Sequence, residues 1–210
     1  MLIVSLSVGQ LQTNCHLVFD ETSGGCIVID PGDDGQLILQ KIQDEKAKPV
    51  ALIATHGHFD HLMAVLELQL AFQVPFLIHQ KDEFLVKRLR QTAQHFVGTD
   101  PGPAPKVDES LDSAKHLEFG NTQLQIIETP GHTPGGVSLY SQKEGVIFVG
   151  DTLFANGEVG RTDYAYASLE DLQESIGKLL TLPGKTIVYP GHGPETTIGA
   201  ERQFHELGEK

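Results

Sequence analysis

The sequence has few of the features that mark secreted, membrane or disulfide-rich proteins. It contains two cysteines and no tryptophan among its 210 residues. Two cysteines are too few for a disulfide framework, so Cys15 and Cys26 are expected to be buried free thiols. No apolar run approaches the roughly 20 residues that cross a bilayer. The first eight residues carry neither Lys nor Arg, which argues against a secretory signal peptide. These absences predict a cytoplasmic protein with no membrane partner.

Positive charge is also scarce. Fifteen Lys and Arg residues stand against 28 Asp and Glu residues, which gives a formal net charge of -13. Binding to a phosphate backbone requires clustered Lys and Arg, so no nucleic acid partner is expected. Hydrophobic residues make up 40% of the chain, which is enough for a substantial core. From the length we predict a single domain that spans residues 1–210.

The hydrophobic pattern predicts two successive sets of strands, each closed by helices. Strands are expected at residues 2–8, 15–20, 26–30, 50–54, 75–78, 116–119, 122–129, 136–141, 146–150 and 186–189. Helices are expected at residues 34–46, 61–72, 81–96, after a capping residue at Ser168, and at 199–207. Such elements pack best as two sheets face to face with helices outside. We therefore predict an α/β fold, a four-layer αβ/βα sandwich of two mixed β-sheets.

Histidine and aspartate residues gather directly after several of these strands. Residues 55–61 read Thr-His-Gly-His-Phe-Asp-His and follow the strand at 50–54. Loops at strand ends converge on a rigid scaffold, so side chains that follow different strands can meet at one edge of a sheet. The sequence therefore predicts one site built from seven side chains: His56, His58, Asp60, His61, His132, Asp151 and His192.

The spacing of these residues suits metal binding. In an extended chain, residues two apart point the same way, so His56 and His58 can bind one ion. Asp60 and His61 come where the chain turns into a helix and can face a second ion. Seven ligands are too many for one tetrahedral ion, but they suit two ions roughly 3.5–4 Å apart with Asp151 between them. Imidazole and carboxylate ligands lead us to expect two divalent ions, with zinc first and iron or manganese as alternatives.

Scattered surface histidines are the competing interpretation. For a single histidine that interpretation is preferable, but the His-x-His-x-Asp-His motif with three further strand-end ligands favours a metal site. The other histidines have no such neighbours in the sequence. They are expected to be surface or core residues: His16, His79, His95, His116 and His205.

These motifs resemble those of the metallo-β-lactamase superfamily over nearly the whole chain. The similar segments are Val-Ile-Asp-Pro-Gly at 28–32, the motif at 55–61, Thr-Pro-Gly-His-Thr-Pro-Gly at 129–135, Gly-Asp-Thr-Leu-Phe at 150–154 and Tyr-Pro-Gly-His at 189–192. Within that superfamily, Gly-Arg-Thr-Asp at 160–163 and Gly-His-Gly-Pro-Glu-Thr-Thr at 191–197 look most like the short glyoxalase II-like hydrolases.

The resemblance implies how the ligands divide. The first metal would be held by His56, His58 and His132. The second would be held by Asp60, His61 and His192, with Asp151 bridging the two. Asp30 and Thr55 would orient ligand imidazoles, although strand capping and turn formation explain these two residues equally well.

Two departures from the family pattern bear on the substrate. One main class of lactamases places Cys where this chain has Asp151, which weakens a β-lactamase interpretation. Full-length glyoxalase II relatives carry an extra C-terminal helical region that helps to bind glutathione. This chain ends at Lys210 after one short predicted helix, so the resemblance leaves glutathione specificity open.

Hydrolysis is the chemistry that two adjacent cations favour. They bring the pKa of a shared water towards neutrality and stabilise an oxyanion. A thiolate, from a thiol of pKa about 8.5, departs without a strong general acid, whereas an amide nitrogen must first be protonated. Asp60 is the candidate for moving a proton. We therefore expect hydrolysis of a small-molecule thioester or ester, and the resemblance to glyoxalase II-like hydrolases implies an acylglutathione such as S-lactoylglutathione.

Three residues near the predicted metal ligands are candidates for contacting the substrate. Arg161 could bind a substrate carboxylate through its forked guanidinium, although an ion pair with Asp163 is the favoured alternative. Phe154 and Tyr164 could line the pocket, and simple packing is an equally good explanation for both.

Two other functional classes compete with hydrolysis. Mononuclear iron persulfide dioxygenases also resemble this chain, including its Gly-Arg-Thr-Asp stretch, and would use one iron, a reduced ligand set and molecular oxygen. A non-enzymatic binding domain is the weakest of the alternatives, because degenerate members normally lose ligands and all seven are present. Lactonase and nuclease activities are compatible with the fold, but the acidic charge argues against a nuclease.

Overall fold

The computed structural model describes residues 1–113 and 115–205. The first sheet is built from the N-terminal half of the chain. The first sheet has the strand order β1-β2-β3-β4-β5-β6. Its first three strands pair antiparallel, and β3 to β6 pair in parallel. The strands are β1 (Leu2–Val8), β2 (Thr13–Phe19), β3 (Gly25–Ile29), β4 (Lys48–Ile53), β5 (Phe76–Ile78) and β6 (Glu109–Ser110).

The second sheet comes from the C-terminal half and has the order β12-β11-β10-β9-β8-β7. Only β10 and β11 pair in parallel, and the other pairs are antiparallel. Both sheets are therefore mixed, as predicted. The strands are β7 (His116–Phe119), β8 (Thr122–Glu128), β9 (Val137–Ser141), β10 (Val146–Gly150), β11 (Ile187–Pro190) and β12 (Thr196–Thr197).

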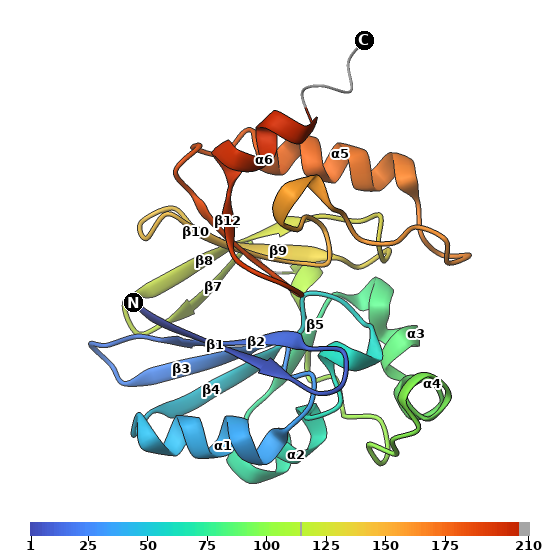
Figure 1. The fold of residues 1–210 in the computed structure, drawn as a ribbon. Helices are drawn as coiled ribbons and strands as arrows, with labels where there is room; N and C mark the ends of the chain where they lie inside the picture. The colour runs from blue at the N-terminus through green and yellow to red at the C-terminus, as the bar shows by residue number, and fades with distance from the viewer. Residues whose placement is uncertain (114, 206–210) are drawn as a thin grey trace.

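Helices cover the outer faces of both sheets (Figure 1). The first sheet is covered by α1 (Gly35–Asp44) and α2 (Val65–Phe72), and the second by α5 (Leu169–Leu180) and α6 (Ile198–His205). Two shorter helices, α3 (Glu83–Val86) and α4 (Leu89–Val97), lie to the side of the sandwich. This arrangement confirms the predicted four-layer αβ/βα fold.

Strand β3 shows how one segment can supply two cores. All five of its residues are buried. Successive side chains of a strand point to opposite faces. Cys26 and Val28 accordingly pack in the cluster under the helices, while Ile27 and Ile29 pack in the cluster between the sheets.

Cys26 and Cys15 are free and buried, and burial raises the pKa of the Cys26 thiol to about 12. The prediction of buried free thiols is therefore confirmed.

Helix α5 begins where the sequence predicts. The Ser168 side chain accepts a hydrogen bond from the backbone N–H of Asp171, which satisfies one of the first free N–H groups of the helix. Leu172, Ile176 and Leu179 then point into the core under the second sheet, at the spacing of one helix face.

Other helices differ from the prediction. The helix expected at 81–96 is divided into α3 and α4, and the helix expected at 61–72 starts only at Val65 because residues 59–61 form a tight 3₁₀ turn. The end of the helix expected at 199–207 lies outside the described residues.

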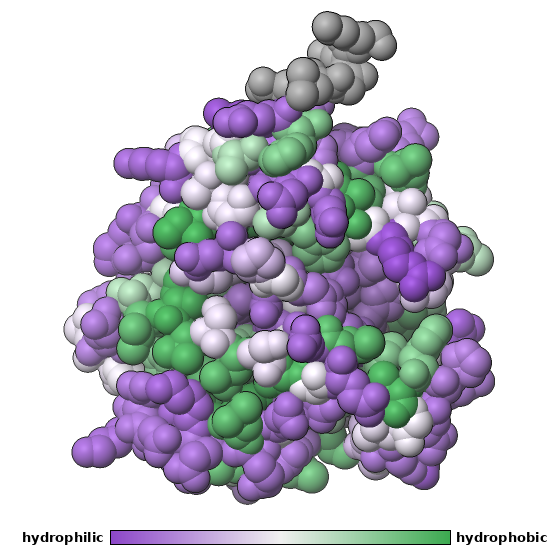
Figure 2. All heavy atoms as spheres, in the orientation of Figure 1, coloured by the Kyte–Doolittle hydropathy of each residue, from purple (hydrophilic) through white to green (hydrophobic). Residues whose placement is uncertain are grey.

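None of the described helices is both long and apolar enough to span a membrane. Figure 2 shows hydrophilic side chains along the lower margin of the molecule, over α1.

Candidate metal centre

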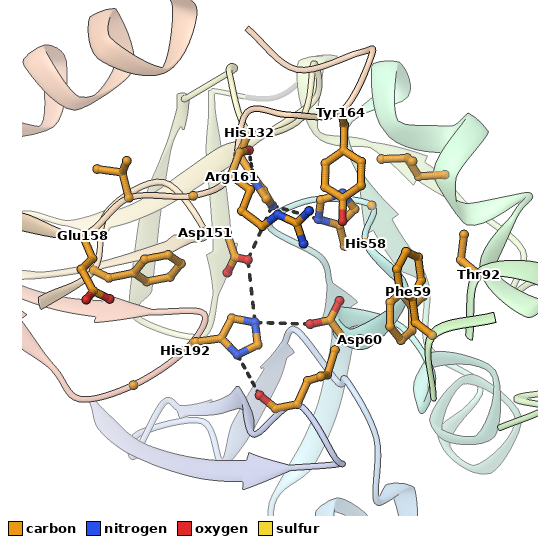
Figure 3. Close-up of a pocket in the computed structure, with 18 of the residues that line it drawn as sticks. His58, Phe59, Asp60, Thr92, His132, Asp151, Glu158, Arg161, Tyr164 and His192 are labelled. Carbon is orange, nitrogen blue, oxygen red and sulfur yellow. Dashed lines mark hydrogen bonds and ion pairs between the residues drawn. The ribbon is translucent and has the colours of Figure 1, made fainter. Parts of the chain in front are cut away.

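The seven predicted ligands come from four loops, each of which follows a strand. Residues 55–61 follow β4, His132 follows β8, Asp151 follows β10 directly and His192 follows β11. The two sheets present these strand ends at the same side of the sandwich, so the loops meet between them. Figure 3 shows His58, Asp60, His132, Asp151 and His192 around one cavity. The structure therefore brings together the side chains that the sequence singles out.

Four of the side chains form a first group around a common point. His58 Nδ1 lies 3.1 Å from His56 Nε2 and 2.8 Å from His132 Nε2. Asp151 Oδ2 lies 3.5 Å from His132 Nε2 and 4.0 Å from His56 Nε2. Each residue offers one atom, and all four atoms lie within 4.8 Å of one another.

A second group forms beside the first. His192 Nε2 lies 3.2 Å from Asp60 Oδ2, and His61 Nε2 lies 3.7 Å from the same oxygen. Asp151 extends towards this group as well, with Oδ1 3.5 Å from His61 Nε2 and Oδ2 3.7 Å from His192 Nε2. Asp151 thus stands between the two groups.

The outer nitrogens of two histidines donate to backbone carbonyl groups. His132 Nδ1 is 2.7 Å from the carbonyl oxygen of Arg161, and His192 Nδ1 is 3.1 Å from that of Leu11. A carbonyl oxygen only accepts, so Nδ1 carries the proton in both rings. In the neutral rings, the inner Nε2 atoms therefore present lone pairs to the site.

Two further histidines are oriented by Asp30 and Thr55. The Thr55 hydroxyl donates its hydrogen to Asp30 Oδ2 at 2.7 Å, so Thr55 Oγ1 accepts the hydrogen bond from His56 Nδ1 at 3.1 Å. Asp30 Oδ2 also lies 3.1 Å from His61 Nδ1. In the neutral rings of His56 and His61, these contacts place the proton on Nδ1 and leave a lone pair on the inner Nε2. Asp30 and Thr55 occupy the supporting positions expected of them.

The convergent atoms fit cations. Lone pairs and carboxylate oxygens repel one another when they share a small volume without a positive charge. His61 Nε2 and Asp151 Oδ1 are both buried and have no hydrogen-bond partner among residues 1–113 and 115–205. Unpartnered buried polar atoms are costly, and a bound ion is one of the few arrangements that satisfies them. Imidazole nitrogen with carboxylate oxygen is a donor set that zinc, iron and manganese accept.

The electrostatics of the two groups differ. Burial, with a contribution from His132, lowers the pKa of His58 to about 3, and burial also lowers the pKa of His56. Burial acts in the same direction on His61, but the carboxylates of Asp151, Asp30 and Asp60 outweigh it and raise the pKa of His61 to about 10. A positive charge is therefore favoured in the second group, between its carboxylates.

Two glycines allow the backbone to approach the ligands closely. A Cβ at Gly191 would run into Asp151 Oδ1 and the ring of His61. A Cβ at Gly160 would run into the carbonyl oxygen of Asp151 and the ring of His132. Both positions require glycine because the chain passes directly over Asp151 and the rings of His61 and His132.

A cavity of about 740 Å³ opens over the ligands, and Phe154, Tyr164 and Arg161 line it. Arg161 forms a bidentate ion pair with Asp163, with its Nη2 2.7 Å from Oδ2 and its Nε 3.0 Å from Oδ1. Its guanidinium also lies over the Tyr164 ring, 5.1 Å from the centroid. The favoured alternative for Arg161, an ion pair that shapes the loop, matches this geometry.

Sequence reasoning missed Tyr166. Its hydroxyl lies 2.9 Å from His58 Nε2, and its ring stacks on Tyr164 with centroids 5.3 Å apart. The contact joins residues 108 positions apart in the chain, and no local motif around Tyr166 signals it.

The five histidines outside the predicted ligand set lie outside both groups. His16 and His79 are buried. His16 contacts the Ser5 hydroxyl and the Pro190 carbonyl oxygen, and His79 accepts the backbone N–H of Lys81. In the part of the chain that the structure describes, none of the possible metal-binding groups includes His16, His79, His95, His116 or His205.

Comparison with known proteins places this architecture in one family. The sequence profile of the Metallo-beta-lactamase superfamily matches residues 8–192. The chain is 40% identical to an uncharacterized protein from Aquifex aeolicus, over 98% of this chain and 96% of the relative. It is 35% identical to the hydroxyacylglutathione hydrolase GloC from Haemophilus influenzae, over 97% of this chain and 96% of the relative.

Solved structures with a similar fold include a metallo-beta-lactamase and a di-iron protein. The B3 metallo-beta-lactamase BLEG-1 superposes with a TM-score of 0.90 at 34% identity, with complete coverage of both chains. TTHA1623, solved in a di-iron-bound form, has a TM-score of 0.86 at 34% identity and covers 96% of this chain and 98% of its own. ETHE1 from Myxococcus xanthus has a TM-score of 0.76 at 25% identity and covers 98% of this chain and 83% of its own.

Proposed function

The chain belongs to the metallo-β-lactamase superfamily, and we propose that it is a binuclear metallohydrolase that cleaves small thioesters. The observation that carries the proposal is the convergence of two groups of possible ligands on either side of Asp151. In this proposal His56, His58 and His132 would hold the first ion. Asp60, His61 and His192 would hold the second.

The residues around the ions divide the remaining tasks. When bound, two divalent cations would lower the pKa of a water towards neutrality and would stabilise the negative charge of a developing oxyanion. Asp60 is held ionised, because His61 and His192 outweigh the effect of burial and lower the pKa of its carboxyl. The ionised carboxylate suits a metal ligand. We also assign Asp60 the catalytic role of passing on a proton, because it lines the cavity beside His192 and its low pKa means that it holds that proton only briefly.

A thioester fits the groups that the cavity offers. Cleaving an amide would require an acid to protonate the nitrogen, and Tyr166 in the cavity wall is a weak one because burial raises the pKa of its phenol. Arg161 is already paired with Asp163. A thiolate needs no such acid. The volume of about 740 Å³ suits a ligand of drug-like size. The similarity to a hydroxyacylglutathione hydrolase supports S-lactoylglutathione as the first substrate to test.

The test is a hydrolysis assay on metal-free protein that is reloaded with zinc, manganese or iron. We expect metal-dependent release of glutathione from S-lactoylglutathione, and its loss when a chelator is added. A protein that binds the metals and turns over neither this thioester nor a panel of simpler acyl thioesters would contradict the proposal. A chromogenic cephalosporin belongs in the same assay because a B3 metallo-beta-lactamase is among the similar structures.

A persulfide dioxygenase is the second candidate, and the similarity to ETHE1 favours it. That activity would use one iron and molecular oxygen. One measurement separates the two candidates. Oxygen consumption with glutathione persulfide, by protein that holds a single iron, would favour the dioxygenase over the hydrolase. The second ligand group, with His192 Nε2 only 3.2 Å from Asp60 Oδ2, is the reason to place hydrolysis first.

A further inference from the structure

Asp82 is a fully buried carboxylate outside the predicted ligand set. Its exposed fraction is 0%. It lies at the end of a 3₁₀ turn (Gln80–Asp82), directly before α3. A buried carboxylate is costly unless hydrogen bonds satisfy both of its oxygens, so its partners indicate what it does.

Those partners are the two loops that carry the first ligand group. Asp82 Oδ2 accepts the backbone N–H of Gly57 at 2.8 Å, and Oδ1 accepts that of Gly135 at 2.6 Å. Gly57 lies between His56 and His58, and Gly135 lies three residues after His132. One side chain thus joins the loop that follows β4 to the loop that follows β8.

The two glycines fit this contact. A Cβ at Gly135 would lie 2.7 Å from Asp82 Cγ, and a Cβ at Gly57 would lie 2.9 Å from the Asp82 carbonyl oxygen. Any larger residue would push the loop away from the Asp82 segment. The loops are also joined by a backbone hydrogen bond from Val137 N–H to the Thr55 carbonyl oxygen, at 2.9 Å. The Asp82 side chain links the same two loops a second time, at positions closer in sequence to His58 and His132.

We propose that Asp82 is a positioning residue, which holds the two loops at the separation where His56, His58 and His132 converge on one ion. The inference rests on the metal site of the proposed function, but not on the identity of the substrate. Asp82 touches none of the ligand rings in this role. It acts through the backbone of Gly57 and Gly135, and so on the first ligand group more than on the second.

The variant Asp82→Asn tests the proposal. An amide has one oxygen and one NH₂ group, so in either orientation its NH₂ faces a backbone N–H and one of the two links is lost. Groups that orient metal ligands typically change metal affinity by about 10–100-fold when altered. We expect a loss of at least about 10-fold in the affinity of the first site, with little change at the second.

Asp20→Asn is the matched control. Asp20 is also buried, at 3% exposure, and accepts backbone N–H groups from two turns, those of Ser23 at 2.7 Å and Asn121 at 3.0 Å. It follows the end of β2 that is remote from the metal centre, whereas Thr13 at the other end bridges to His192. It should lose comparable stability and keep normal metal affinity.

The measurement is a Co²⁺ titration of metal-free protein in competition with a chromogenic chelator, with thermal unfolding of each metal-free variant alongside. Wild-type affinity in Asp82→Asn, or an equal loss in Asp20→Asn, would overturn the proposal. If Asp82→Asn does not fold, Asp82→Glu takes its place, and wild-type affinity there counts against the proposal equally. Protein that binds Co²⁺ normally but hydrolyses no thioester would contradict the proposed function alone.

Discussion

At the scale of single residues, the partner of the outer nitrogen sets the tautomer of four of the five predicted ligand histidines. His132 and His192 donate to backbone carbonyl groups, His56 donates to Thr55, and His61 lies against Asp30. In the neutral ring, each of these contacts leaves a lone pair on the inner nitrogen. The capacity of these histidines to bind a metal therefore depends on residues outside the predicted ligand set.

Thr55→Val should weaken metal binding without a change in side-chain shape. The substitution removes the hydroxyl that donates to Asp30 and accepts from His56. We expect a fall of about 10–100-fold in zinc affinity, measured by competition with a chelator. Thr186→Val is the control, because Thr186 is also buried and its hydroxyl has no hydrogen-bond partner within the described residues. Equal affinities for the two variants would contradict the role of Thr55.

His16 should make the metal-free protein sensitive to acid. Burial lowers its pKa from an ordinary 6.5 to about 4. Between these values the unfolded chain binds a proton that the folded protein does not, so stability falls as the pH falls from 6.5 to 4. One such proton corresponds to at most about 1.4 kcal/mol per pH unit.

In His16→Gln we therefore expect a shallower fall in the free energy of unfolding over that pH range. Urea denaturation at several pH values, with chelator present, measures the difference between the two proteins. The other histidines contribute equally to both, so they cancel. Parallel curves for wild type and variant would show that His16 does not titrate in this way.

At the scale of elements, helix α5 supports the His132 loop. The backbone N–H of Ser168 donates to the carbonyl oxygen of Gly131, and the Ser175 hydroxyl donates to that of Pro130. Gly131 has φ 136°, and a Cβ there would run into the backbone of Leu172. The first turns of the helix therefore fix the loop that presents His132.

Gly177→Ala should stabilise α5 without affecting the metal centre. Gly177 lies inside the helix and is exposed, and an added Cβ would meet nothing within 4 Å. Replacing a mid-helix glycine by alanine typically gains about 0.5–1 kcal/mol. We expect a rise of about 1–4 °C in the unfolding temperature, with unchanged zinc affinity. A lower unfolding temperature would mean that α5 is packed differently from the description above.

At the scale of the whole molecule, the layers could be predicted because they depend on local pattern. Runs such as Cys26 to Ile29 and Val146 to Val149 are apolar throughout, as buried strands are. Four short loops after strands then placed all seven candidate ligands. What failed was the continuity of the helices near the site: residues 81–96 have a helical pattern, but the chain breaks between α3 and α4.

Contacts between distant parts of the chain could not be predicted. Asp82 and Tyr166 have no motif around them, and they matter only because folding brings them to Gly57 and His58. Arg161 was selected for its side chain, yet the structure also uses its backbone carbonyl to orient His132. Backbone contacts of this kind leave little trace in residue type.

The central claim is that the four loops build two adjacent cation sites. Metal-free protein saturated with Zn²⁺ and passed through gel filtration can be analysed for zinc per chain, in parallel with His192→Ala. We predict two zinc ions per chain for the wild type and one for the variant, because His192 belongs to the second group alone. Wild-type protein that retains one zinc or none under these conditions would contradict the account.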